Sequence, residues 1–398
     1  MSHPQEGRRA FLRSACRHCA ALGLGGAGLS APALAQAPVA EPTLPPARLA
    51  RPALDTDEGG LWALMDREET RLRRSPFVVR DKTLAAYLEQ LVCRLGGEHC
   101  RDVRVHVVRT PVFNATMAPN GMMQIWTGLL LRVENEAQLA AVLGHEIGHY
   151  LERHQLELLR AAKDRAAAGQ VLGLFGLAGA VASLAVVASG FAFSREQESR
   201  ADAIGMRLMQ AAGYDGRQAA QVWDNLLGEL EVTGGEDAGR RSVMMATHPP
   251  AADRRDELLR LAGAGEGRIG ADEFEQAMAP HRLGWLQEEI RRGQFEESLV
   301  LFRRMLARRP GDAQVQFARG EVYRQRDGQG DLELARQDLR AASAAASPPT
   351  EAFRSLGLVL RRLADPAGAA LAFEQYLALA PQAVDAALIR QYLTELKP

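Results

Sequence analysis

Near its middle the chain reads His145-Glu146-Ile147-Gly148-His149. Histidines four residues apart lie on one face of a helix, so both imidazoles can reach a single metal ion. Glu146 follows the first histidine and is placed to take a proton from a metal-bound water. The pattern indicates a zinc site with His145 and His149 as ligands and Glu146 as general base. Two surface histidines on an ordinary helix are the alternative.

The surrounding residues predict a helix over 135–153 that can carry such a site. Gly144 and Gly148 would let a second element approach this helix closely. His154 lies one turn beyond His149, off the metal-facing pair, and is expected to be structural. The apolar positions around the proposed ligands are Leu139, Val142, Leu143 and Ile147.

A catalytic zinc needs a third protein ligand and an open position for water. The stretch 194–205 offers two carboxylates four residues apart, Glu198 and Asp202. In metal sites one carboxylate often binds the ion while a second accepts a hydrogen bond from a ligand imidazole and orients it. Here Glu198 would be the ligand and Asp202 the orienting acceptor. Glu196 is the competing ligand, although it would lie on another face of the helix.

Two extended segments interrupt the helical pattern between residues 55 and 260. Valines at 103, 105, 107 and 108 predict a buried strand, and 113–126 is a second extended stretch that a turn at 119–121 breaks. A small mixed sheet packed on helices is therefore expected. Residues 122–126 form either an edge strand that holds an extended substrate or a covered interior strand.

The N-terminus has the order of an export signal. Arg8 and Arg9 belong to a charged region, a mildly apolar Gly- and Ala-rich run follows, and a small-x-small sequence ends at Ala35. The paired arginines resemble a twin-arginine signal; a general secretory signal and an uncleaved anchor are the alternatives. We expect 1–35 to be a signal peptide cleaved after Ala35, 36–54 a Pro- and Ala-rich leader, and the mature protein to be periplasmic.

Export also bears on the cysteines. Cys16 and Cys19 fall inside the signal, which leaves Cys93 and Cys100 as the pair in the mature protein. In an oxidising compartment we expect a disulfide between them. Two free buried thiols are the alternative.

Residues 171–193 contain no charged side chain and are long enough to span a membrane. Their glycines and serines, and their position between two segments that must meet at one metal, favour a hairpin or a buried helix near the active site. We expect a hairpin that contacts the membrane surface or controls substrate access rather than a segment that spans the membrane.

After about residue 263 the composition changes to paired amphipathic helices. Pro310 and Pro381 each end a helix pair, and the spacing resembles tetratricopeptide repeats. About three units would cover 279–382, followed by a capping helix over 383–396. This predicts an all-α repeat domain over 279–398, with an unrelated helical bundle as the alternative.

The amino-acid composition excludes several classes of protein. The 398 residues carry 48 Lys plus Arg against 49 Asp plus Glu, a net charge of −1, which gives no electrostatic reason to expect nucleic acid. The chain is 47% hydrophobic and too long for one compact core, so two domains are expected. A disordered chain and a small disulfide-built scaffold are excluded.

Residues 55–262 resemble the M48 family of zinc metallopeptidases. Asn120 stands where the family usually has a glycine, a mild departure because asparagine also tolerates the left-handed region. The segments that carry the resemblance are Phe113-Asn114-Ala115, Pro119-Asn120-Gly121, Gly128-Leu129-Leu130, Asn135-Glu136, 143–149 and 198–202.

The resemblance implies one Zn²⁺ per chain with Glu198 as its third protein ligand. It also marks His248 and Arg254. In one branch of the family the corresponding histidine can approach zinc as a fourth ligand and occlude it, and the arginine lies near the active site. His248 and Arg254 are therefore expected to regulate the site or to contact the substrate, where either could steady the oxyanion. An ordinary loop histidine is the alternative for His248.

The expected fold class is α+β: a mostly helical zincin-like metallopeptidase domain with a small sheet, followed by an all-α tetratricopeptide-like repeat domain. With this tail the chain is similar to the periplasmic chaperone-protease branch associated with outer-membrane protein assembly. The similarity implies hydrolysis of unfolded or misassembled envelope proteins, with repeats that dock clients or the assembly machinery. A chaperone or adaptor with latent protease activity is the alternative, and an integral membrane protease is a third hypothesis.

Overall fold

The computed structural model describes residues 51–167, 192–232, 243–248 and 254–396. The expected signal peptide, leader residues 36–50 and nearly all of the uncharged segment 171–193 lie outside the described residues. None of the helices in the described part is long and apolar enough to cross a membrane.

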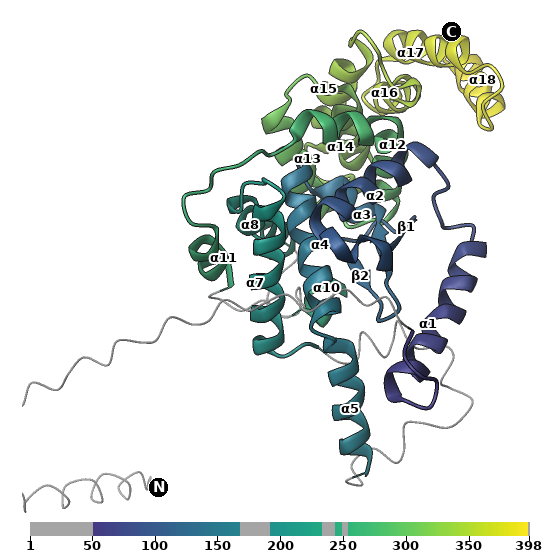
Figure 1. The fold of residues 1–398 in the computed structure, drawn as a ribbon. Helices are drawn as coiled ribbons and strands as arrows, with labels where there is room; N and C mark the ends of the chain where they lie inside the picture. The colour runs from purple at the N-terminus through teal and green to yellow at the C-terminus, as the bar shows by residue number, and fades with distance from the viewer. Residues whose placement is uncertain (1–50, 168–191, 233–242, 249–253, 397–398) are drawn as a thin grey trace, which may run out of the picture. The chain divides into compact units, whose positions relative to one another are not determined.

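Helices dominate the described chain (Figure 1). Those before residue 263 are α1 (Asp57–Arg74), α2 (Lys82–Gly96), α3 (Thr127–Arg132), α4 (Glu136–Leu151), α5 (His154–Ala167), α7 (Arg195–Ala211), α8 (Arg217–Glu231), α10 (Val243–Thr247) and α11 (Arg254–Ala262). The C-terminal tail contains α12 (Ala271–Arg291), α13 (Phe295–Arg308), α14 (Ala313–Arg326), α15 (Asp331–Ser343), α16 (Thr350–Arg362), α17 (Pro366–Leu379) and α18 (Ala386–Glu395). A short 3-10 helix over Gly97–Asp102 follows α2.

A three-stranded sheet packs against α2 and α4. Its strands are β1 (Arg104–Val108), β2 (Ala115–Met117) and β3 (Met122–Trp126), in the spatial order β1-β3-β2. β1 pairs with β3 in parallel and β2 pairs with it antiparallel, so the expected small mixed sheet is confirmed. β3 is the central strand of the described sheet. The edge-strand hypothesis for 122–126 is therefore wrong, and β2 is the edge strand that faces α4.

Helices α4 and α7 lie side by side in Figure 1, and their backbones touch. A Cβ atom added at Gly148 would lie 2.7 Å from the carbonyl oxygen of Ala201, and one at Gly144 would lie 3.0 Å from that of Gly205. One at Gly205 would lie 2.7 Å from the amide nitrogen of His145. Only glycine permits such an approach, so the close packing predicted for Gly144 and Gly148 is confirmed.

The tail is helical, as expected. α14 packs on α15 and α16 on α17 as helical hairpins. A glycine lies at each of these two contacts: a side chain at Gly320 would meet Leu339, and one at Gly357 would meet the ring of Phe373. The identity of these hairpins as tetratricopeptide repeats stays a prediction.

The tail begins inside the same hydrophobic core as the sheet and α4. Leu143 of α4 and Leu286 and Phe302 of the first tail helices belong to one cluster of buried side chains. A buried ion pair network reinforces this junction. Arg132 of α3 donates to Glu229 of α8 over 2.7 Å and to Glu289 of α12 over 2.8 Å.

The members of this network are almost without solvent contact. Arg132 is 5% exposed, Glu229 2% and Glu289 0%. Arg304 of α13 adds a hydrogen bond of 2.8 Å to Glu229, and Ser298 donates to Glu289 over 2.9 Å. Burying these charges is tolerated only because each is paired.

Elsewhere, Glu69 fastens α1 to the sheet. Its carboxylate is 5% exposed and accepts hydrogen bonds from Arg104 Nη2 over 2.6 Å and from His106 Nε2 over 3.0 Å. Burial raises the pKa of Glu69, but the bonds from His106 and Arg104 outweigh burial and hold the pKa at about 2.

Cys93 at the end of α2 and Cys100 are joined by a disulfide, with their Cα atoms 4.6 Å apart.

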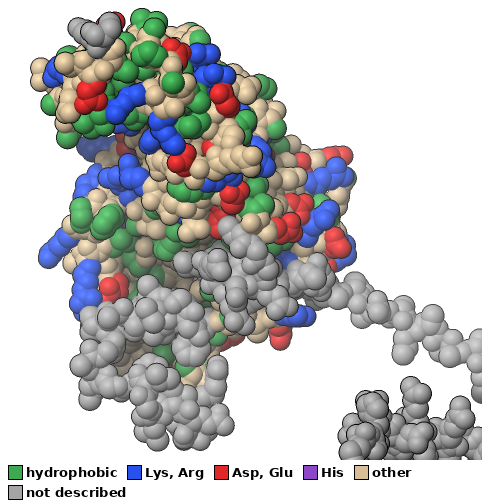
Figure 2. All heavy atoms as spheres, turned by 180° about the vertical axis from the view of Figure 1, so that it is seen from behind, with side chains coloured by type: hydrophobic (Ala, Val, Ile, Leu, Met, Phe, Trp, Pro, Cys, Tyr) green, Lys and Arg blue, Asp and Glu red, His purple; other side chains and the backbone are tan. Residues whose placement is uncertain are grey.

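On the outer surface, acidic and basic side chains are interspersed over the face shown in Figure 2. Hydrophobic side chains also appear at its upper end, over the C-terminal helices; the exposed apolar residues of these helices and of the α17–α18 loop are Leu371, Leu379, Val384 and Leu388.

Replacing Arg132 by methionine should destabilise the protein by about 3–5 kcal/mol, because Glu229 and Glu289 would remain buried with one cation fewer. Urea unfolding followed by circular dichroism measures the loss. Arg308→Met is the control: this side chain is 42% exposed and its pair with Glu134 is 3.8 Å long, so the loss should stay below about 1 kcal/mol. Equal losses for the two variants would contradict a structural role for the buried network.

Glu69→Gln should cost about 1–3 kcal/mol at pH 7 and progressively less in acid. The folded-state pKa of about 2 lies below the ordinary glutamate pKa of 4.5, so the carboxylate stabilises the fold above pH 4.5 and loses this effect as pH falls toward 2. Unfolding midpoints of wild type and variant should therefore converge below pH 4.5. Glu68→Gln, which removes a surface pair with Arg71, is the control. A gap that stays constant from pH 7 to pH 3 would refute the assignment.

Candidate metal centre

Helix α4 presents both histidines of the central motif on its buried face. Asn135 caps the helix, its side chain accepting from the amide of Gln138 over 2.9 Å. From there the helix runs unbroken through the motif. His145, Glu146 and His149 are 4%, 3% and 2% exposed, so the alternative of two surface histidines is wrong.

Helix α7 brings the two downstream carboxylates to α4. Ser194 and Gln197 form a capping box at its start, which fixes where the helix begins. Glu198 and Asp202 are buried on the side that faces α4, whereas Glu196 is exposed. Of the two candidate ligands, Glu198 is therefore the one that lies at the histidines.

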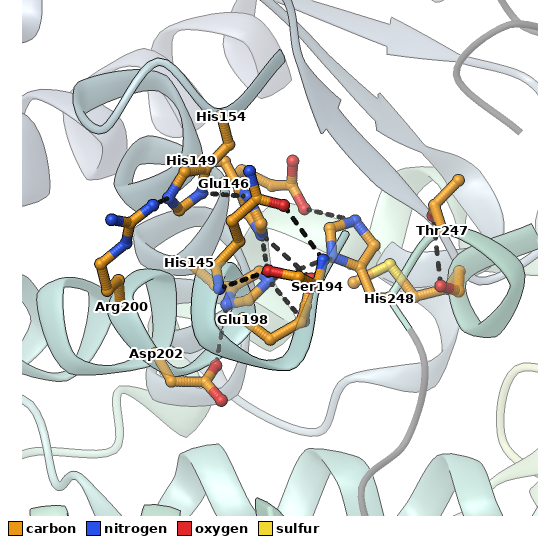
Figure 3. A network of polar contacts seen from close by, with 12 residues as sticks. His145, Glu146, His149, His154, Ser194, Glu198, Arg200, Asp202, Thr247 and His248 are labelled. Carbon is orange, nitrogen blue, oxygen red and sulfur yellow. Dashed lines mark hydrogen bonds and ion pairs between the residues drawn. The ribbon is translucent and has the colours of Figure 1, made fainter. Parts of the chain in front are cut away.

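Four side chains converge on one point, as Figure 3 shows: His145, His149, Glu198 and His248. His145 Nε2 lies 3.0 Å from His149 Nε2 and 3.2 Å from His248 Nδ1. Glu198 Oε1 lies 3.4 Å from His149 Nε2 and 2.9 Å from His248 Nδ1. Ligand atoms about 2.0–2.2 Å from a tetrahedral zinc are about 3.3–3.6 Å apart. The spacing and the nitrogen and oxygen donors therefore fit zinc.

The electrostatics keep Glu198 ionised and His149 neutral, the forms that bind a metal. Burial raises the pKa of Glu198, but hydrogen bonds with His149 and His248 outweigh burial and hold the pKa well below its usual range. Burial and the charge of His145 lower the pKa of His149 well below its usual value.

Asp202 orients His145. Its Oδ1 accepts from His145 Nδ1 over 2.8 Å, which turns the other ring nitrogen toward the donor cluster. Burial opposes a charge on His145, but the Asp202 carboxylate outweighs burial and raises the pKa of the imidazole.

Arg254 holds Asp202 in turn. Its Nε and Nη2 donate to the two oxygens of Asp202, each over 2.8 Å, and its Nη1 lies 2.6 Å from Glu198 Oε2. Its guanidinium stacks 4.1 Å from the ring centre of Trp223. The guanidinium of Arg254 is thus held by the carboxylates of Asp202 and Glu198 and by the ring of Trp223.

Glu146 points into the cluster without joining it. It is 3% exposed, and its Oε1 has no hydrogen-bond partner among the described residues; His248 Nε2 lies 3.6 Å away. Burial raises the pKa of Glu146. A buried carboxylate with a free oxygen beside the donor cluster can take up a proton there.

Comparison with known proteins identifies this region. Residues 79–262 match the model of peptidase family M48. They form an M48 peptidase domain. The mitochondrial metalloendopeptidase OMA1 of Arabidopsis thaliana is 36% identical over 181 residues, which are 43% of this chain and 36% of that protein.

Two bacterial relatives are also similar. The beta-barrel assembly-enhancing protease of Escherichia coli K12 is 27% identical over 198 residues, 45% of this chain and 39% of that protein. Metalloprotease YcaL of the same organism is 28% identical over 191 residues, 46% of this chain and 71% of that protein. The chain thus spans less than half the length of OMA1 and of the assembly-enhancing protease.

In the M48 domain His248 supplies a fourth donor. It follows α10, its amide donates to the carbonyl of Met244 over 2.8 Å, and its ring is buried at 2% exposure. The ring lies beside Phe193, whose own ring centre is 4.0 Å from that of His149. A hydrogen bond of 3.0 Å from the Phe193 amide to the Thr247 carbonyl joins the residue before the Ser194 cap to the residue before His248.

The sequence did not single out Phe193. Phe193 gave one signal, its position directly before the Ser194 cap. His154 lies outside the donor group and hydrogen-bonds to its neighbours, in agreement with the structural role expected for it. His154 is fully buried, and its Nδ1 lies 2.8 Å from His149 Nδ1, so it is a neighbour of the metal centre. Arg153, with φ of +57°, stands between the end of α4 at Leu151 and the start of α5 at His154.

Gly148→Ala should separate α4 from α7 in the M48 domain, since the added Cβ would lie 2.7 Å from the Ala201 carbonyl oxygen. We expect a loss of roughly 1–3 kcal/mol in stability, as for overpacking in cores, together with weaker zinc retention. Thermal unfolding and zinc content after dialysis against a chelator measure both. Gly228→Ala in α8, where an added Cβ meets nothing within 4 Å, is the matched control. Equal zinc retention by the two variants would disprove the constraint.

Proposed function

We propose that this protein is a zinc metalloendopeptidase of the cell envelope, and the observation that carries the proposal is the convergence of His145, His149 and Glu198 beside Glu146. Bound there, zinc would supply an activated water and polarise the scissile carbonyl. Membership of residues 79–262 in the M48 family supports peptide hydrolysis as the reaction.

The chain's own residues have separable roles in this proposal. Glu146 accepts the proton of the attacking water and returns it to the leaving amine. Asp202 fixes the ring of His145 from the far side, 2.8 Å away. The three contacts of Arg254 with Asp202 and Glu198 favour a positioning role for it over direct contact with the oxyanion.

We propose that His248 holds the enzyme latent. Its Nδ1 lies 2.9 Å from Glu198 and 3.2 Å from His145, among the donors that would hold zinc. A fourth protein ligand leaves no position for water, so the site would open only when His248 withdraws.

The substrates we propose are unfolded or misassembled envelope proteins, outer-membrane proteins in particular. Support comes from the signal-like residues 1–35 and from the name of the Escherichia coli relative, a beta-barrel assembly-enhancing protease. The tail would bind clients or the assembly machinery, for which helical hairpins offer an extended surface.

The decisive experiment measures zinc content and casein hydrolysis of the purified protein beside Glu146→Gln and His248→Ala. We expect one equivalent of zinc in wild type, a loss of activity of at least about 10²-fold in Glu146→Gln, and activity above wild type in His248→Ala. Glu196→Gln, which removes an exposed carboxylate from the same helix, serves as the control and should leave zinc content and rate unchanged.

Absence of zinc from the wild-type protein would overturn the proposal. Equal hydrolysis by wild type and Glu146→Gln would do so as well. A lower rate in His248→Ala would refute latency while leaving the peptidase assignment in place.

The second candidate function is that of a chaperone or adaptor with latent protease activity. The position of His248 among the donors favours it, as do the exposed apolar side chains of the last helices. Zinc binding without hydrolysis in any variant, together with suppression of aggregation of an unfolded β-barrel protein by Glu146→Gln, would establish this function instead.

A further inference from the structure

His154 makes two contacts that both depend on which of its ring nitrogens carries the hydrogen. Its Nδ1 lies 2.8 Å from His149 Nδ1, and its Nε2 lies 3.0 Å from Nη2 of Arg200. Figure 3 shows His154 between these two residues. A neutral imidazole has one N–H donor and one bare acceptor nitrogen, so the two contacts are linked.

Metal binding fixes the contact with His149. His149 Nε2 faces the donor cluster, and a ligand nitrogen carries no hydrogen. The ring hydrogen of His149 must then be on Nδ1, where it donates to His154 Nδ1. His154 would have to carry its own hydrogen on Nε2.

Arg200 imposes the opposite arrangement. A guanidinium can only donate, so its contact with His154 requires a bare Nε2 and a hydrogen on Nδ1. His154 then donates to His149 Nδ1, and the hydrogen of His149 moves to Nε2, where the metal would bind. The Arg200 contact and a metal on His149 are therefore mutually exclusive for neutral rings.

Arg200 has other partners available when it leaves His154. Its Nη2 already donates to Glu157 Oε2 over 3.2 Å, and its Nε lies 3.5 Å from Glu152 Oε2. The side chain is 40% exposed, so it can move without unpacking the core.

We propose that His154 is a positioning residue that accepts the ring hydrogen of His149 when zinc is bound, and that Arg200 competes with zinc by holding His154 in the opposite tautomer. The inference rests on the proposed zinc site. It adds that metal affinity is set partly from α7, through a residue that touches no ligand.

The test is zinc affinity of the full chain, measured by competition with a chromophoric chelator, with Co²⁺ absorption spectra as a second readout. His154→Phe fills the space without an acceptor and should raise the Kd for zinc about 10–100-fold, the usual effect of losing a partner of a ligand histidine. His154→Asn keeps an acceptor oxygen near Nδ1 and should retain most of the affinity. Arg200→Met should lower the Kd.

A double variant separates competition from simple removal of a positive charge. If Arg200 acts through His154, its effect disappears in the His154→Phe background. A gain in affinity from Arg200→Met cannot come from misfolding, and thermal unfolding with chelator present checks the other variants.

The outcomes separate the two proposals. Wild type without zinc affinity overturns the proposed function and this inference together. Wild-type affinity in His154→Phe overturns the positioning role alone. An Arg200→Met effect that persists in the double variant, or no effect in the single one, overturns the competition.

Discussion

The metal centre depends on the contact between the backbones of α4 and α7. Two of the proposed ligands come from α4 and one from α7, and their side chains meet only because Gly144, Gly148 and Gly205 let the helix axes approach. A methyl group at any of these positions would press on a peptide group of the other helix, and rigid helices would pass the shift to the ligand atoms. The three glycines thus determine how closely the donor atoms of the two helices approach one another.

Close packing also explains the charge arrangement. Glu198, Asp202 and Arg254 are nearly out of water, so each needs a partner, and each partner is another member of the site. With Glu198, Asp202 and Arg254 paired in this way, Glu146 Oε1 is an acceptor without a hydrogen bond in the described site. The same pairing that makes burial tolerable leaves one reactive oxygen pointing inward.

Much of this could be predicted from spacing. Ligands four residues apart on a helix, the glycines beside them and the mixed sheet follow from local periodicity. Which of Glu196 and Glu198 faces α4 also follows from helix geometry. His154 and Phe193 could not be placed in this way. One depends on a left-handed Arg153 that separates α4 from α5, and the other on a backbone bond to Thr247, far away in sequence. The position of β3 depended on the pairing partner of β1, which period-two alternation does not specify.

The buried pairs of Arg132 have a consequence for modularity. Because Glu289 and Arg304 lie in the first two tail helices and belong to the network that Arg132 closes, those helices are a folded part of the peptidase region. The whole tail therefore cannot be removed from the peptidase region without breaking this buried network. An exchange of tail helices between proteins of this kind would have to keep α12 and α13 with the peptidase region and vary only the hairpins that follow.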